Sequence, residues 1–196
     1  MKQHQFQDLT IQIFNDSTFS FGSADNRHHY LKHYFGRDLQ GYIASKLGIK
    51  IFDEDNEINS CIIMGSGGAT GVHENSSLLD YDRLLVCCCD SVFCLTLPDL
   101  NLLWQTHADT ATCLQVFKFE NDYLVHGELE ISRIDKNGNI KWQFSGADIF
   151  VSFEGAEEFI LNPDHILLKD FSGRQYKIDF DGQELRSGSA STQNGR

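Results

Sequence analysis

The sequence predicts an all-β protein: a propeller-like array of about four four-stranded antiparallel units, with an N-terminal hairpin. Residues 92–105 and 131–144 carry the same pattern, in which an alternating apolar strand, a polar turn and a second strand end in Trp-Gln. The only two tryptophans, Trp104 and Trp142, lie 38 positions apart. A period near forty residues with four short strands is typical of propeller blades, because one such sheet cannot bury both of its faces alone.

The first forty residues are expected to form the N-terminal hairpin and a loop. Apolar and polar residues alternate through residues 1–22, and Asn15-Asp16-Ser17 has the composition of a turn. In the following segment, Ser23 or Asp25 is suited to cap a helical turn. A first, degenerate unit is then expected from residue 41, with a turn at 53–56 and a strand at 57–64.

Three further units repeat one order of strands and turns, and Asn-Gly at 137–138 and Asp-Gly at 181–182 are strong turn signals. We expect a single β-repeat domain over residues 1–186, with its four blade-like units at 41–186, and a flexible tail at 187–196. The expected strands of the three units are 77–82, 84–89, 92–97 and 102–107; 113–119, 123–127, 129–134 and 140–144; and 149–153 or 159–161, 165–170, 174–179 and 183–185.

Residues 77–185 resemble the β-propeller repeat of the pyrroloquinoline-quinone type. In that repeat a strand leads to an aspartate, a glycine turn and a docking tryptophan, and Asp135, Gly138 and Trp142 occupy these places. Trp104 is the matching residue of the unit before, although Leu-Pro-Asp-Leu replaces the glycine turn there. The resemblance implies a scaffold in which Trp104 and Trp142 each close one unit against the next. The resemblance concerns the scaffold and does not imply a bound quinone, so we expect no cofactor.

The net charge of −12 points to the kind of partner. Binding to nucleic acid depends on Lys and Arg that neutralise phosphates, so we expect neither nucleic acid nor an anionic membrane surface as a partner. Acidic surfaces keep proteins soluble, and they also steer basic proteins during encounter. We therefore expect a protein partner, and a basic one fits this charge best.

The six cysteines are expected to be buried, free thiols. The chain opens with MKQHQFQDLT, which lacks the apolar segment of a signal peptide, and this favours a cytoplasmic protein. Cys87, Cys88 and Cys89 are consecutive in an apolar run, so in a strand at most two of them share a face. Their spacing does not match that of a zinc site.

The segment from Gly65 to Asn75 is the most loop-like part of the chain. Successive glycines can expose backbone N–H groups to an anion, which makes this segment a candidate ligand-binding loop. His73 and Glu74 follow the glycines directly and are the candidate catalytic acid–base pair. A plain connection between two blades explains the same composition. The four glycines concerned are Gly65, Gly67, Gly68 and Gly71.

His29 and His33 are the candidate metal ligands. They lie four positions apart, which would place both on one face of a helix, with Asp25 or Asp38 as a third ligand. No strong catalytic signature such as GxSxG, HExxH or a P-loop is present. A solvated polar segment explains these histidines equally well.

Two functions from different classes follow from these features. The first is a non-enzymatic cytosolic binding module, a propeller-like scaffold for protein–protein interaction, in one version a bacterial immunity-type or regulatory protein. The alternative is a small-ligand-binding protein or enzyme that uses the loop from Gly65 to Asn75 with His73 and Glu74. Exposed sheet edges would also allow a homodimer.

Overall fold

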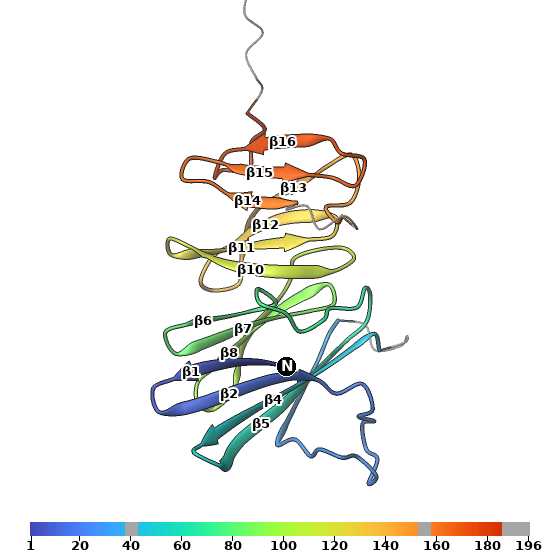
Figure 1. Ribbon diagram of the computed structural model, residues 1–196, viewed down its shortest axis with the longest axis vertical. Helices are drawn as coiled ribbons and strands as arrows, with labels where there is room; N and C mark the ends of the chain where they lie inside the picture. The colour runs from blue at the N-terminus through green and yellow to red at the C-terminus, as the bar shows by residue number, and fades with distance from the viewer. Residues whose placement is uncertain (38–42, 153–157, 186–196) are drawn as a thin grey trace, which may run out of the picture. The chain divides into compact units, whose positions relative to one another are not determined.

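The computed structural model describes residues 1–37, 43–152 and 158–185, which form β-strands, turns and loops and contain no helix. This confirms the predicted all-β, propeller-like class, since the strands form four sheets that are antiparallel apart from one pairing (Figure 1). The strands are β1 (Lys2–Phe6), β2 (Leu9–Asn15), β3 (Lys32–Phe35), β4 (Ser45–Asp53), β5 (Asn56–Gly65), β6 (Ser77–Asp80), β7 (Arg83–Cys88), β8 (Ser91–Thr96), β9 (Leu102–His107), β10 (Cys113–Phe119), β11 (Asp122–Gly127), β12 (Glu130–Ile134), β13 (Ile140–Ser145), β14 (Phe159–Leu161), β15 (Ile166–Lys169) and β16 (Gln175–Ile178).

The chain divides into two compact units, unit 1 over Met1–Ser145 and unit 2 over Gly146–Arg196. Unit 1 holds sheet A, with the order β1-β2-β4-β5-β3, sheet B, with the order β6-β7-β8-β9, and sheet C, with the order β10-β11-β12-β13. Sheets B and C have the same meander order, as the paired Trp-Gln segments predict. In the described part of the chain no helix has the length and apolarity needed to cross a bilayer.

Sheet A differs from the prediction at the N-terminus. The hairpin turns at Gln7 and Asp8, and β2 runs on to Asn15, so Asn15-Asp16-Ser17 is not the turn of the N-terminal hairpin. A turn does follow β2 there, since the Phe19 N–H donates to the Asp16 carbonyl at 3.1 Å. Burial explains why β2 extends this far: β2 pairs with β4 along its whole length, which places Ile11 and Ile13 in the core. The N-terminal hairpin is therefore part of the first sheet.

The segment after β2 forms turns instead of the expected helical turn. Ser23 Oγ accepts a hydrogen bond from the Asp25 N–H at 3.2 Å, which closes a short turn, and no helix follows. This segment leads to β3, which pairs with β5 in parallel. Phe19 and Tyr30 from the segment pack with Ile62 and Met64 of β5 and cover the outer face of sheet A.

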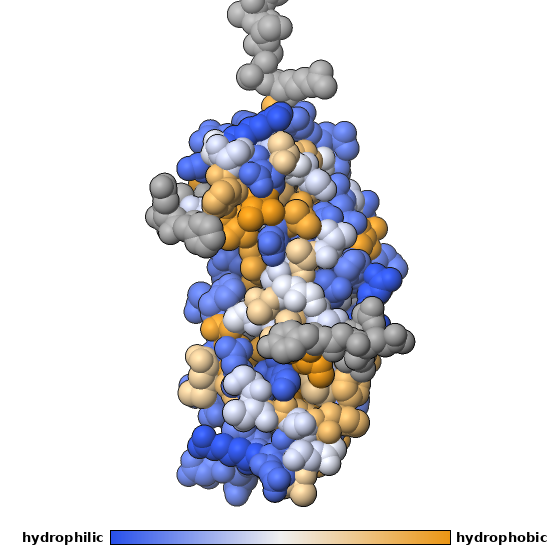
Figure 2. All heavy atoms as spheres, turned by 90° about the vertical axis from the view of Figure 1, so that its right-hand side faces the viewer, coloured by the Kyte–Doolittle hydropathy of each residue, from blue (hydrophilic) through white to orange (hydrophobic). Residues whose placement is uncertain are grey.

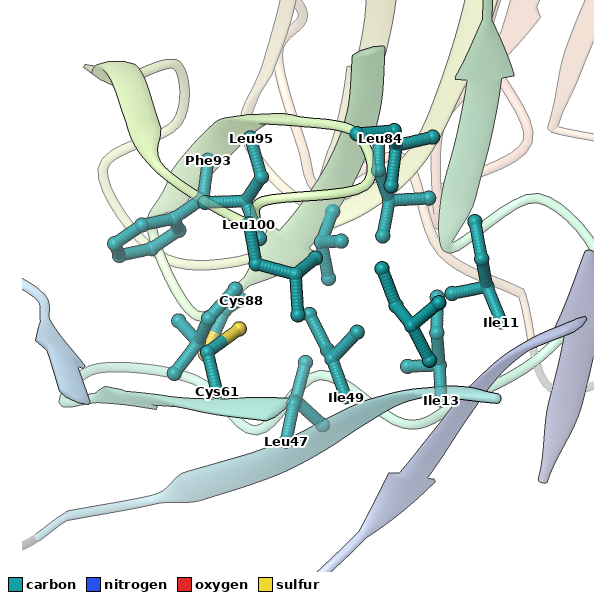
Figure 3. Close-up of a cluster of buried hydrophobic side chains, with 14 of the residues drawn as sticks. Ile11, Ile13, Leu47, Ile49, Cys61, Leu84, Cys88, Phe93, Leu95 and Leu100 are labelled. Carbon is teal, nitrogen blue, oxygen red and sulfur yellow. The ribbon is translucent and has the colours of Figure 1, made fainter. Parts of the chain in front are cut away.

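Two apolar layers hold the three sheets of unit 1 together. Between sheets A and B, side chains from β2 and β4 face those from β7 and β8, as Figure 3 shows for Ile13, Leu47 and Ile49 opposite Leu84 and Leu95. Between sheets B and C a second layer includes Val92, Cys94, Val116, Tyr123 and Val125. Sheet B is therefore buried on both faces, which explains why β7 is almost continuously apolar.

A buried carboxylate fixes the connection between sheets B and C. Asp109 Oδ1 accepts the N–H groups of Ala111 and Thr112 at 2.6 and 2.8 Å. Its Oδ2 accepts the N–H groups of Leu129 and Glu130 at 2.8 and 2.7 Å. The side chain thus joins the loop before β10 to the turn before β12 and satisfies four backbone donors away from water.

Trp104 of β9 packs on the turn between β12 and β13. Its Nε1 donates to the Lys136 carbonyl at 3.1 Å, and Thr106 Oγ1 donates to the Gly138 carbonyl at 2.6 Å. A Cβ on Gly138 would lie 2.8 Å from the indole, and Gly138 has a φ of 89°, so both space and conformation require glycine there. Closing one unit against the next would bury both tryptophans almost completely, but Trp104 and Trp142 are only half-buried.

Unit 2 contains the three-stranded sheet β14-β15-β16. Tyr176 OH donates to Asp170 Oδ2 at 2.7 Å and accepts from the Ala147 N–H at 2.7 Å. The predicted last strand of the fourth unit is reduced to one bridge, between Ile178 and Glu184. Part of the expected strand 149–153, the first residues of the expected unit at 41–42 and the tail 187–196 lie outside the described residues.

Replacing Asp109 by Asn should destabilise the protein by about 2–3 kcal/mol, because an amide turns two donor hydrogens toward backbone N–H groups that need an acceptor. Urea unfolding at neutral pH measures the change. The control is Asp99→Asn, at an exposed turn residue, where a change within about 0.5 kcal/mol is expected. Equal effects of the two variants would contradict the role assigned to Asp109.

Replacing Trp104 by Ala should cost about 1.5–3 kcal/mol, less than a fully buried tryptophan, because part of the ring already faces water. Thermal unfolding followed by circular dichroism tests this. The neighbouring Leu103, 46% exposed, is the control, and Leu103→Ala should change stability little. A Trp104→Ala protein as stable as the Leu103→Ala protein would show that the indole does not hold the β12–β13 turn.

Candidate functional site

The glycines of the predicted ligand loop are mostly explained by packing. A Cβ on Gly65 would lie 2.9 Å from Cys89 Sγ, and one on Gly68 would lie 1.7 Å from Thr112 Oγ1. Gly67 has a φ of 106°, which favours glycine. Gly71 is exposed with no atom near the position of a Cβ. Three of the four glycines thus have a structural reason that involves no ligand.

A cleft of about 680 Å³ opens beside this loop, where β2 ends and β4 begins. Ser45, Lys46, Thr70 and Gly71 contribute to its wall. The Lys46 ammonium donates to the carbonyls of Phe19 and Ser17, at 2.7 and 3.3 Å. Lys46 therefore ties the segment after β2 to β4, which leaves it little capacity to bind an anion.

His73 and Glu74 are brought together with two residues of β1, Lys2 and His4. The four line a small polar hollow of about 350 Å³. Lys2 Nζ donates to the carbonyls of Glu74 and Ser77, the latter at 2.9 Å, and His4 Nε2 lies 2.9 Å from Ser77 Oγ. Sequence reasoning missed Lys2 and His4, although their alternate positions in β1 place them on one face.

Both imidazoles of this hollow are held neutral. Burial, followed by the charge of Lys2, lowers the pKa of His4 to about 4. Partial desolvation is also the main cause that lowers the pKa of His73, although its side chain is exposed in part. Burial likewise lowers the pKa of Lys2, against the attraction of Glu74. The hollow offers two neutral histidines and an ammonium that already donates to backbone carbonyls, which is a weak basis for acid–base catalysis.

His29 and His33 do not lie on a helix. His29 is exposed in the turn segment, and His33 belongs to β3, so their spacing does not produce the expected chelating face. His33 instead contacts Phe19 and Phe21, with ring centroids 5.9 and 5.4 Å apart. No group of three potential ligand side chains suited to a metal is found among the described residues, which exclude Asp38.

The hairpin turns of unit 1 gather along one side, which we call the turn edge, on the left in Figure 1. It consists of the turns β1–β2, β4–β5, β6–β7, β8–β9, β10–β11 and β12–β13. Figure 2, in its lower part, shows the opposite side of unit 1, where hydrophilic and hydrophobic side chains are mixed. The exposed carboxylates of the turn edge are those of Asp8, Asp53, Glu54, Asp55, Asp82, Asp99 and Glu120.

Tyr81 projects from the turn edge beside a cleft of about 520 Å³ between the turns of sheets B and C. Its side chain is 88% exposed, and its φ of 54° lies in the left-handed region. The wall of the cleft is firm: Asp80 Oδ2 accepts from Lys118 Nζ at 2.6 Å and from Tyr123 OH at 2.7 Å. Arg83 Nη1 donates to the Lys136 carbonyl at 2.6 Å. Sequence reasoning missed Tyr81, whose only signal was an aromatic residue between two aspartates.

Replacing His4 by Gln should reduce the loss of stability in mild acid. In the folded protein the pKa of His4 is about 4, against 6.5 for an ordinary histidine, so between these pH values the unfolded chain binds a proton that the folded chain does not. Stability from this group is complete above pH 6.5 and falls as the pH drops toward 4. Urea unfolding at pH 7 and pH 5 measures it. The exposed His29→Gln serves as control, and an unchanged pH dependence in His4→Gln would contradict this role.

Comparison with known proteins supports the fold and nothing finer. No family model and no curated protein matches the chain. Among solved structures, BamB from Moraxella catarrhalis, a β-propeller protein, is similar with a TM-score of 0.50 and 10% identity over 72% of this chain and 44% of BamB. The dihydro-heme d1 dehydrogenase NirN follows, with a TM-score of 0.48 and 15% identity over 74% of this chain and 32% of NirN. The chain thus spans less than half of either protein. It has a propeller-type fold, and the pyrroloquinoline-quinone type of repeat stays a prediction.

Proposed function

We propose that this protein is a non-enzymatic binding module that docks a basic protein on the turn edge of unit 1. The observation that carries the proposal is the row of exposed carboxylates at successive turns of sheets A, B and C. Of these seven side chains, only Glu120 has an ion pair among the described residues, with Arg133 at 3.5 Å. The immunity-type or regulatory version of the proposal has the same requirement, a basic partner.

The spacing of the sheets lets these charges act together. Stacked sheets lie about 10 Å apart, which is close to the distance of about 8–10 Å over which physiological salt screens a charge. Carboxylates on neighbouring turns therefore reinforce one another's field at the surface. Such a field accelerates encounter with a basic protein and weakens as salt is added.

Part of this acidity has a structural origin. Asp8, Asp55 and Asp82 each hold the second position of a two-residue turn, where Asp and Asn are favoured for their conformation. In the β10–β11 turn Asn121 occupies the same position without a charge. The turns would form equally well with Asn, so the charge of Asp at three of these positions is not needed by the fold.

Tyr81 supplies the apolar component that charge alone lacks. Aromatic side chains are enriched among the residues that dominate binding energy at protein interfaces, and they are surrounded there by polar groups. Tyr81 combines high exposure with a fixed backbone and a cleft beside it. We assign it the role of anchor within the acidic rim.

We also propose a reducing compartment such as the cytosol. All six cysteines are free thiols and buried, and no described pair forms a disulfide. The alternative function, a ligand site at His73 and Glu74, has less support. Both side chains are exposed, and the nearby ammonium of Lys2 donates to backbone carbonyls.

Removing three charges from the turn edge should strongly reduce capture of the partner without loss of stability. In the triple variant Asp8→Asn, Asp55→Asn and Asp82→Asn, the turns keep a favoured residue and lose three charges. The wild-type chain, immobilised, should retain a basic protein from a cell extract at low salt and less of it at physiological salt. The triple variant should retain roughly tenfold less at equal salt.

Two further variants sharpen this experiment. Tyr81→Gly removes the ring at a φ that glycine adopts freely, and it should also lower capture. The matched control neutralises three exposed acids that do not belong to the turns of the turn edge, Asp25→Asn, Glu74→Gln and Glu184→Gln, and should behave as wild type. Retention of no protein by the wild type, or of the same proteins by the turn-edge variant, would refute the proposal.

A further inference from the structure

Cys88 and Cys89 lie on the same face although they are consecutive. In an extended strand neighbouring side chains point to opposite faces, and Cys87 and Cys88 obey this rule. Cys87 packs in the layer between sheets B and C, and Cys88 in the layer between sheets A and B. Cys89 begins the β7–β8 turn with a φ of 52°, which returns its side chain to the layer of Cys88.

The two sulfur atoms are neighbours. Both lie against the backbone of Gly65, because a Cβ there would be 2.9 Å from Cys89 Sγ and 3.3 Å from Cys88 Sγ. A glycine at this position is therefore what allows both sulfur atoms to occupy one small space.

Cys89 is surrounded by groups that orient it and stabilise its thiolate. Its N–H donates to Thr70 Oγ1 at 2.8 Å, and its carbonyl accepts from the Cys113 N–H at 2.6 Å. Ser45 Oγ accepts from the Thr70 N–H at 2.9 Å, and the nearby Ser45 helps to lower the pKa of Cys89. The neighbouring thiol of Cys88 is the largest cause that lowers the pKa of Cys89 to about 7, while burial raises the pKa of Cys61, Cys87, Cys94 and Cys113.

A cleft open to solvent lies close to this pair. Ser45, which helps to lower the pKa of Cys89, and Thr70 both line the cleft of about 680 Å³ beside the glycine loop. Cys89 is itself fully buried, and it lies beneath Thr70, to which its N–H donates. A molecule as small as hydrogen peroxide can pass this side chain when the loop moves locally.

We propose that Cys88 and Cys89 form a dithiol site for oxidation by hydrogen peroxide, with Cys89 as the attacking thiol and Cys88 as the resolving one. The Cys89 thiolate attacks one peroxide oxygen, the S–O bond forms, the O–O bond breaks, and hydroxide leaves and takes up a proton. The Cys88 thiol then attacks the Cys89 sulfenic acid, the S–S bond forms and water leaves. Two thiols are oxidised, one peroxide is reduced to two waters, and the chain loses two hydrogens.

The oxidation would act on the junction of the three sheets. Cys89 bonds through its backbone to Thr70, in the loop after sheet A, and to Cys113, at the start of sheet C. An S–S bond to the preceding residue changes the backbone of the β7–β8 turn, so these two hydrogen bonds are the first that it would disturb. Oxidation of Cys88 and Cys89 requires neither the turn edge nor a partner.

The test exposes the folded, full-length protein to a small excess of hydrogen peroxide and then measures the intact mass and the number of free thiols. A mass lower by about 2 Da is expected, with two thiols lost and both recovered on reduction. Peptide mapping under non-reducing conditions should place the new bond between Cys88 and Cys89. Six free thiols after treatment, or a bond between other cysteines, would overturn the proposal.

Three alanine variants separate the roles of the cysteines. Cys88→Ala should stop at the sulfenic acid, which dimedone traps on Cys89, and Cys89→Ala should give neither product. Cys87→Ala is the matched control, since Cys87 is equally buried on the other face of β7, and it should form the disulfide as wild type does. Either product in Cys89→Ala, or loss of the disulfide in a folded Cys87→Ala, would overturn the proposal. If Cys89→Ala fails to fold, the peptide map of the wild type decides.

Discussion

The rest of unit 1 depends on the burial of sheet B from both sides. A four-stranded meander with two apolar faces is unstable alone, and here one face packs on sheet A and the other on sheet C. Asp109 and Trp104 fix sheet C against sheet B at its two ends, and the loop glycines admit the close approach of sheets A, B and C around Cys89.

The repeat was predictable because its signals are local. In sheets B and C the strand order and nearly all boundaries follow from alternating apolar residues and from turns rich in Asp, Asn and Gly. The N-terminal hairpin was misjudged for the same reason: Gln7-Asp8 is a weak turn signal and Asn15-Asp16-Ser17 a strong one. Burial of Ile11 and Ile13 against sheet B decides the register, and a local pattern does not contain that information.

The candidate sites were predicted less well, because the same residue type can be required either for ligand binding or for packing. The glycines of the loop suggested a ligand, and the structure gives Gly65 and Gly68 a packing role against Cys89 and Thr112. The predicted metal site at His29 and His33 required a helix, but the structure has strand β3 at His33. Lys2 and His4 meet His73 only because β1 lies beside the end of the glycine loop, a contact more than seventy positions apart in sequence.

Five two-residue turns of unit 1 share one design, and it explains where side chains can acquire a function. Each places a residue other than glycine at a φ near 50° and follows it with Asp or Asn. Because Gln, Glu, Tyr and Cys all occupy this first position, the turn conformation does not require one particular side chain there. Four of the five side chains are exposed on the turn edge, where they can meet a partner. The fifth side chain, that of Cys89, is the only one of the five that points into the core. Its reactivity therefore depends on its neighbours Cys88 and Ser45, which lower its pKa, and on the cleft nearby.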